Sequence, residues 1–212
     1  MNSRKSFIKN TIALACISLI TIGLTSWNPP SATQVEIGDP VPLFQKEMVD
    51  INGAPTFLRQ EMKMNGLLVV FSCNTCPFVL QWENRYNELY ELCAENEIGM
   101  VLINSNEAKR TGDDSLEKMK EKANAEGYKM PYLMDEGHLV ADAFGARTTP
   151  HVFMFDKNAM LAYRGSIDDN SEDKNQVTKH YLKDAINAMS KDETIDPNIT
   201  RSIGCSIKRV AQ

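Results

Sequence analysis

Two cysteines separated by two residues, Cys73 and Cys76, are the side chains of this sequence best suited to chemistry. Only the thiolate form of a cysteine is a nucleophile, and a free cysteine, with a pKa of about 8.5, is mostly un-ionised at pH 7. A position at a helix N-terminus favours the thiolate, because unpaired backbone N–H groups lie beside it. The second thiol, one helical turn on, lies close enough to attack a mixed disulfide formed at the first. The spacing predicts thiol–disulfide exchange, with Cys73 as the exposed nucleophile and Cys76 as the more buried resolving thiol.

The flanking residues place this pair between a strand and a helix. Residues 67–71 form a continuous apolar run of strand length. Apolar residues then recur at spacings of three and four over residues 78–93, which predicts an amphipathic helix. Cys93 belongs to the apolar stripe of that helix, so we expect it to be a buried structural thiol.

The rest of the chain alternates strands with helices. Further strands are expected at residues 100–103, 152–155 and 161–163, and helices at residues 114–127, 135–145 and 177–188. This order predicts an α/β fold with a mixed central sheet, closed by an antiparallel hairpin and covered by helices on both faces. Asp114, followed by Glu117, resembles a helix-capping pair. Residues 168–170 are interpreted as a solvated turn.

Composition and charge narrow the class of protein. The 212 residues are 42% hydrophobic and 24% charged, which is typical of a soluble globular domain. The net charge of −5, without a basic stripe, argues against a nucleic-acid partner. One domain with short terminal extensions is expected.

The N-terminal residues have the layout of an export signal. Arg4, Lys5 and Lys9 precede a mostly apolar run over residues 11–24, which contains Cys16. We expect residues 1–32 to be a signal peptide or an N-terminal membrane anchor plus linker, residues 33–190 to be the folded domain, and residues 191–212 to be a loosely packed tail. The protein would then be periplasmic or otherwise extracytoplasmic.

Several motifs outside the cysteine pair point to one family. They are residues 37–44 (IGDPVPLF), residues 131–136 (PYLMDE), residues 148–151 (TTPH) and, in the tail, residues 204–208 (GCSIK). With these motifs the chain resembles the thioredoxin-like superfamily, in particular the redoxin branch related to alkyl hydroperoxide reductase and thiol-specific antioxidant proteins. The resemblance implies a thioredoxin-like fold in which a cis Pro150 faces the dithiol and, with Thr149, shapes a substrate groove. It implies protein thiols or disulfides as substrates, an upstream redox donor or acceptor as partner, and no cofactor or metal.

The sequence also departs from the thioredoxin pattern. Ser72 replaces the Trp that precedes the first cysteine, and Leu67 stands where thioredoxins carry a buried carboxylate. A group that manages the proton of the second thiol must then come from elsewhere in the fold. Glu83, Glu136 and His151 are the candidates, and His151 directly follows the proline.

The sequence also bears on three alternative functions. A peroxidatic cysteine needs Pro and Thr or Ser seven and three residues before it, where Cys73 has Gly66 and Val70. Copper carriers of this fold use C-x-x-x-C rather than C-x-x-C. A non-catalytic binding module with a groove near Pro150 is a further alternative. Cys205 is either an auxiliary thiol that resolves or relays a disulfide or simply a feature of the tail.

Overall fold

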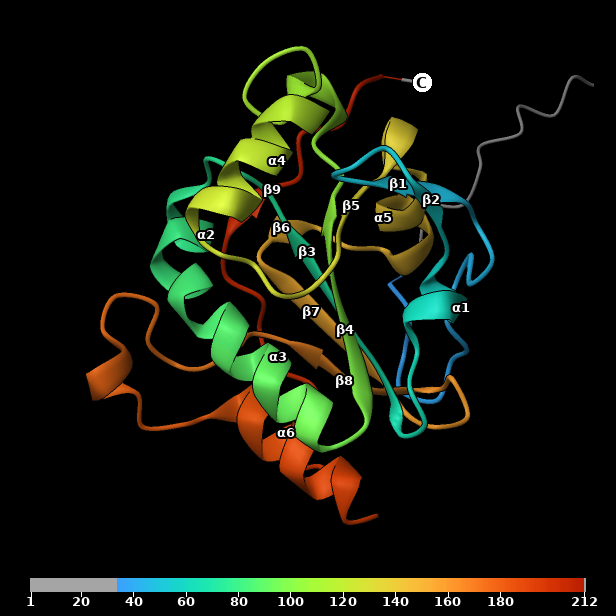
Figure 1. Ribbon diagram of the computed structural model, residues 1–212. Coiled ribbons are helices and arrows are strands. Elements are labelled where there is room, and N and C mark those ends of the chain that lie inside the picture. The colour runs from blue at the N-terminus through green and yellow to red at the C-terminus, as the bar shows by residue number, and fades with distance from the viewer. Residues whose placement is uncertain (1–33, 212) are drawn as a thin grey trace, which may run out of the picture. The chain divides into compact units, whose positions relative to one another are not determined.

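A mixed β-sheet forms the centre of the fold (Figure 1). The computed structural model describes residues 34–211, so the predicted signal or anchor segment lies outside the described residues. The strands of the main sheet run in the order β2-β1-β5-β4-β3-β7-β8. Their bounds are β1 Met48–Asp50, β2 Pro55–Thr56, β3 Gly66–Ser72, β4 Ile98–Asn104, β5 Tyr132–Met134, β7 His151–Phe155 and β8 Leu161–Gly165. Strands β3, β4 and β5 pair in parallel, while β7 pairs antiparallel with both β3 and β8, which confirms the predicted mixed sheet.

Helices cover both faces of this sheet, as predicted. They are α1 Leu58–Glu61, α2 Pro77–Trp82, α3 Tyr86–Glu95, α4 Leu116–Ala125, α5 Leu139–Phe144 and α6 Tyr181–Ser190. The helix expected over residues 78–93 is present, but a turn of 3-10 helix at Glu83–Arg85 divides it into α2 and α3. None of the helices within residues 34–211 is long and apolar enough to cross a membrane.

The central strands supply two separate cores because their side chains alternate between the two faces. Leu68 and Val70 of β3 pack with residues of α3, α4 and α6. Leu67 and Val69 of the same strand pack on the other face with residues of α1 and α5. Every residue of β3 and β4 is buried, which is the pattern of strands covered on both faces. Cys93 is fully buried in the first core, as expected.

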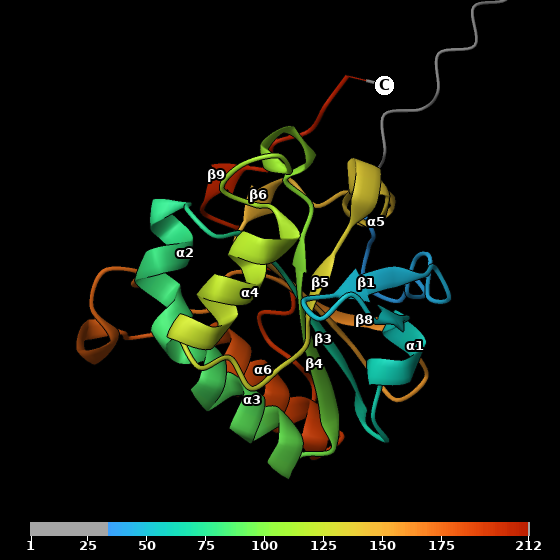
Figure 2. The ribbon, with the colours of Figure 1, turned by 45° about the horizontal axis from the view of Figure 1, so that its top comes forward.

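The C-terminal segment does not pack loosely, in contrast to the expectation. Its strand β9, Cys205–Ser206, pairs antiparallel with β6, Thr148–Thr149, to form a separate two-stranded sheet beside α2 (Figure 2). The N–H of Thr200 donates to the carbonyl oxygen of Arg164 at 3.0 Å. The side chain of Ile207 is buried in the core that contains α5. Backbone pairing and a buried apolar anchor together hold this segment against the domain.

Candidate active site

The cysteine pair lies at the end of a central strand. Strand β3 ends at Ser72, so Cys73 follows it directly, and Cys76 is the N-cap residue of α2 with Pro77 as the first helical residue. Cys76, rather than Cys73, therefore stands at the helix N-terminus. Both side chains are free thiols and are buried, Cys73 with 2% and Cys76 with 5% of its surface exposed. The expectation that Cys73 is the more exposed thiol is wrong for this state of the site.

The loop before β7 faces both thiols. The peptide bond between Thr149 and Pro150 is cis, as the resemblance implied. The hydroxyl of Thr149 lies 3.3 Å from the sulfur of Cys73. The thiol of Cys76 donates to the carbonyl oxygen of the same threonine at 3.1 Å. The structure thus brings together Cys73, Cys76, Thr149 and Pro150, the four residues that the sequence placed at the dithiol and its groove.

A buried polar network holds the linker between the two cysteines. The backbone N–H of Asn74 donates to Oδ1 of Asp114 at 2.8 Å, and its side-chain oxygen accepts from the hydroxyl of Tyr132 at 2.9 Å. The side chains of Asn104 and Asn106 also donate to the Asp114 carboxylate, at 2.7 and 3.0 Å. Asp114 is fully buried, and within the described part of the chain it forms a salt bridge with no Lys, Arg or His. Among the described residues the Asp114 carboxylate thus has amide donors and no direct ion pair, while the guanidinium of Arg110 donates to the backbone carbonyl oxygen of Asp114 at 2.9 Å.

The predicted role of Asp114 as a helix cap is wrong. Ser115 is the N-cap of α4, and its hydroxyl accepts from the backbone N–H of Lys118 at 3.3 Å. Serine and aspartate are equally good cap residues, so their adjacency was the signal that one of them was available for another purpose. Asp114 is a buried carboxylate near the pair, and it comes from a loop rather than from the position of Leu67 in β3.

The surrounding groups shift the pKa values of the two thiols in opposite directions. A hydrogen bond to Cys76 and burial raise the pKa of Cys73, and the charge of Asp114 adds to this effect. The hydrogen bond from Cys73 lowers the pKa of Cys76 against the cost of its burial, and the backbone N–H groups of Val79 and Cys205 also stabilise its thiolate. The thiol form of Cys76 donates to the Thr149 carbonyl, so this sulfur has partners in both protonation states. The hydroxyl of Thr149, 3.3 Å from the sulfur of Cys73, opposes the increase in the pKa of Cys73.

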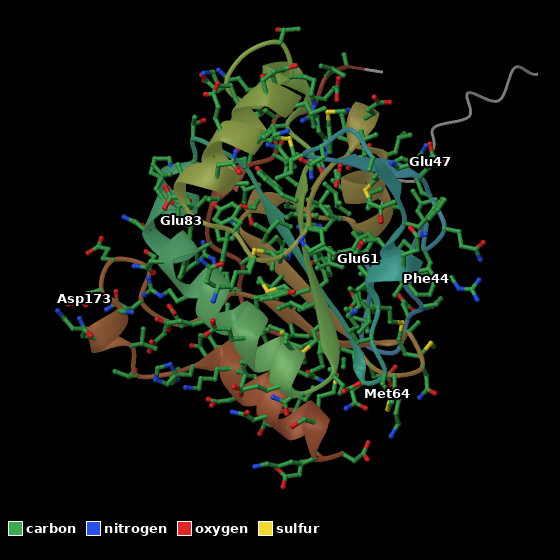
Figure 3. The ribbon with its side chains drawn as sticks, viewed as in Figure 1. Phe44, Glu47, Glu61, Met64, Glu83 and Asp173 are labelled. Atoms are coloured by element: carbon green, nitrogen blue, oxygen red, sulfur yellow. The ribbon has the colours of Figure 1, made fainter. Side chains whose placement is uncertain are left out.

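The three groups proposed from the sequence to manage the proton do not contact the thiols. The carboxylate of Glu83 binds the ammonium of Lys122 and the hydroxyl of Tyr128; Figure 3 labels it beside the α2–α3 segment. Glu136 is exposed. His151 is buried, and its Nδ1 lies 3.3 Å from the backbone N–H of Arg147.

His151 is also unsuited to carry a proton at neutral pH. Burial, together with the charges of Arg164 and Arg147, lowers the pKa of His151 to about 3. Its ring packs on Phe153, with 4.5 Å between the ring centroids, on the face of the sheet that holds α5. This residue is therefore part of the core rather than of the dithiol site.

A third thiol reaches the pair from the C-terminal segment. Cys205 is half-buried and packs against the small cluster formed by Cys73, Cys76 and Val79. Burial raises the pKa of Cys205, and a hydrogen bond to Cys76 acts in the same direction. The site thus contains three cysteines, of which the sequence pattern had paired two.

The strand-end dithiol, the cis-proline loop beside it and the mixed sheet covered on both faces define a thioredoxin-like protein. The chain belongs to the Redoxin family, whose model matches residues 36–181. No protein in a curated collection matches the sequence significantly.

Several solved structures are similar to this chain. A hypothetical protein from Sinorhizobium meliloti 1021 is 31% identical, with 85% of this chain and 98% of that chain covered and a TM-score of 0.77. An uncharacterised conserved protein from Geobacillus kaustophilus is 32% identical over 84% of this chain and 94% of that one, with a TM-score of 0.76. A secreted disulfide oxidoreductase from Mycobacterium tuberculosis shares the fold, with a TM-score of 0.52. It is 13% identical, and the match covers 68% of this chain and 96% of that chain.

Proposed function

We propose that this protein is an exported thiol–disulfide oxidoreductase in which Cys73 and Cys76 form the redox couple. The observation that carries the proposal is the contact of both sulfur atoms with one residue, Thr149, next to the cis-proline. The two thiols also pack in one small cluster, which supports formation of an intramolecular disulfide between them. Membership of the Redoxin family supports thiol chemistry in general.

The reaction is an exchange of one disulfide for another. A thiolate of the pair attacks a disulfide of the substrate protein and forms a mixed disulfide, with release of a substrate thiolate. The second thiol of the pair then attacks the mixed disulfide, which releases the second substrate thiol and leaves Cys73 and Cys76 oxidised. The same steps in reverse oxidise a dithiol substrate. An upstream partner restores the pair in either direction.

The sequence assigned the first attack to Cys73, but the contacts of the reduced site favour Cys76 as the thiolate. The charge of Asp114 opposes ionisation of Cys73, and N–H groups of Val79 and Cys205 face the sulfur of Cys76. We therefore propose that Cys76 carries the charge in the reduced protein and that Cys73 retains the proton.

Export rests on the N-terminal residues. Positive residues followed by the apolar run over residues 11–24 have the layout of an export signal. An oxidising compartment also suits a redox-active cysteine pair. Cell fractionation with N-terminal sequencing of the recovered protein tests this part. Recovery of the uncleaved chain in the cytoplasm would contradict it.

The main test is an equilibrium redox titration of the full chain against glutathione, followed by thiol trapping and mass spectrometry. We expect a single two-electron transition of the Cys73–Cys76 pair, with a midpoint in the range of about −270 to −120 mV that thioredoxin-fold proteins span. A pair that never forms the disulfide would overturn the proposal. Efficient turnover of hydrogen peroxide would instead assign the protein to the peroxidases.

The pH dependence of alkylation tests which sulfur carries the charge. A thiol with a lowered pKa remains a thiolate as the pH falls, so it reacts at pH values where an ordinary cysteine does not. In the reduced protein we expect Cys76 to react with iodoacetamide with a midpoint below the ordinary value of about 8.5. Peptide mapping identifies the labelled residue. Labelling of Cys73 before Cys76 would restore the order that the sequence suggested.

A further inference from the structure

The C-terminal strand presents Cys205 directly to the dithiol. In the β6–β9 pairing, Cys205 lies opposite Thr149, the residue that contacts both sulfur atoms of the pair. Residues directly opposite each other in an antiparallel pair have Cβ atoms about 5 Å apart. The backbone pairing alone therefore brings the third cysteine next to the site.

Local contacts on both sides of Cys205 fix this position. A Cβ atom at Gly204 would lie 2.3 Å from the carbonyl oxygen of Thr149, so glycine allows the closest approach of the two segments. On the other side, the N–H of Ile207 donates to the carbonyl oxygen of Arg147 at 3.0 Å. The N–H of Lys208 donates to the side-chain oxygen of Asn106 at 2.8 Å. Because Asn106 also binds Asp114, the network under Cys73 anchors the tail as well.

The thiol of Cys205 lies in one cluster with the pair. Its side chain packs against Cys73, Cys76 and Val79. Both Cys73 and Cys205 act to lower the pKa of Cys76. Of the three cysteines Cys205 is the most exposed, while the pair itself is buried. A disulfide that passes from the pair to Cys205 would therefore move from the interior toward the surface.

We propose that Cys205 is a third redox thiol that exchanges with the Cys73–Cys76 disulfide and so carries the disulfide toward the surface. The proposal rests on the proposed function of the pair. The thiolate of Cys205 attacks the sulfur of Cys76, the Cys76–Cys205 bond forms as the Cys73–Cys76 bond breaks, and the electron pair of the broken bond leaves on Cys73. The proton lost by Cys205 is matched by the one that Cys73 takes up. The exchange has no net oxidation, and a substrate thiol then attacks the sulfur of Cys205.

The first experiment isolates the new bond in the Cys73→Ser variant of the full chain. The variant is titrated with oxidised glutathione, quenched with acid, digested with trypsin and analysed by mass spectrometry. We expect the peptide of residues 64–85 to be linked to that of residues 202–208. The linked form should exceed the Cys76–glutathione adduct by about tenfold, because an intramolecular thiol competes at a high effective concentration. Adduct at Cys76 with Cys205 free for alkylation would overturn the proposal.

A second experiment uses wild-type protein and does not depend on the folding of that variant. Partly oxidised full chain is quenched with acid during exchange with glutathione, and fragmentation of the linked peptides distinguishes Cys76–Cys205 from Cys73–Cys76. We expect both disulfides, and we expect Cys205→Ser to exchange with glutathione about tenfold more slowly than wild type. An unchanged rate in Cys205→Ser, with no Cys76–Cys205 bond in wild type, would show that the tail only covers the site.

The controls separate the two proposals. Cys93→Ala removes a buried thiol outside the site and should leave the exchange rate unchanged. If the Cys73–Cys76 disulfide forms normally in wild type and in Cys205→Ser, and Cys76–Cys205 never forms, only the role of Cys205 fails. If wild type never forms the Cys73–Cys76 disulfide, the proposed function itself fails.

Discussion

Asp114 and Asp168 are both buried aspartates, but they differ in the partners that satisfy them. The carboxylate of Asp168 accepts from Nε1 of Trp82 at 2.7 Å and from Nε of Arg85 at 3.2 Å, so a buried cation compensates its charge. Among residues 34–211, the carboxylate of Asp114 accepts only from N–H groups of amides, and Arg110 reaches its backbone carbonyl oxygen instead. A compensated carboxylate joins elements of the fold, here the α2–α3 segment and the loop after β8. A carboxylate without an ion-pair partner acts more strongly on nearby titratable groups, and the charge of Asp114 raises the pKa of Cys73.

The comparison predicts that Asp168 has the larger effect on stability. Asp168→Ala leaves the guanidinium of Arg85 buried without its partner, and loss of one member of a buried ion pair costs about 3–5 kcal/mol. Urea unfolding at pH 7 measures this loss. The alkylation profile of Cys76 should not change, because Asp168 is not among the groups that set its pKa. A loss of stability below about 1 kcal/mol would mean that the Arg85–Asp168 ion pair stabilises the fold no more than an exposed ion pair does.

Tyr132 separates the hydrogen-bonding part of the Asp114 network from its charge. Tyr132→Phe removes the hydroxyl that donates to Asn74 and accepts from Asn104, which leaves two buried amides with one partner fewer. The expected cost is about 2 kcal/mol in the free energy of unfolding. Because the carboxylate of Asp114 remains, the rate at which Cys73 is alkylated at a fixed alkaline pH should not change. A large change in that rate would show that the geometry of the linker, rather than the charge of Asp114, controls the thiol.

Asp114→Asn tests the charge directly. The carboxylate raises the pKa of Cys73, so its removal should lower that pKa. We expect a shift of about one pKa unit, so that Cys73 is alkylated about tenfold faster at a fixed alkaline pH. Alkylation of the reduced protein followed by peptide mapping measures this rate. Asp168→Asn is the matched control, since it also removes a buried carboxylate and should leave the alkylation rate of Cys73 unchanged.

Local patterns in the sequence predicted much of the fold. The apolar run before Cys73 became β3, and the stripe with spacings of three and four became α2 and α3. The resemblance carried by residues 148–151 correctly implied the cis bond before Pro150. Strands β1, β2 and β5 were not predicted, because segments of two or three residues show no periodicity of their own. They exist because their neighbours in the sheet pair with them.

The roles of polar residues in loops were predicted least well. Residues 168–170 were interpreted as a solvated turn, yet Asp168 is buried against Arg85, 83 positions earlier in the chain. Asp114 was interpreted as a cap, yet it lies under Asn74, 40 positions earlier. The local sequence does not distinguish a loop aspartate that is hydrated from one that accepts a hydrogen bond from a distant backbone N–H.

The sequence by itself determined the dithiol, the strand and helix that flank it, and the class of fold, because these follow from residue types at short spacings. Only the tertiary structure decided that Asp114 lies beneath the pair, that His151 belongs to the core, and that Cys205 meets Cys76. Each of these depends on which loops meet at one end of the sheet. That is set by long-range strand pairing, such as β6 with β9, and by the burial of Ile207, and not by any local pattern.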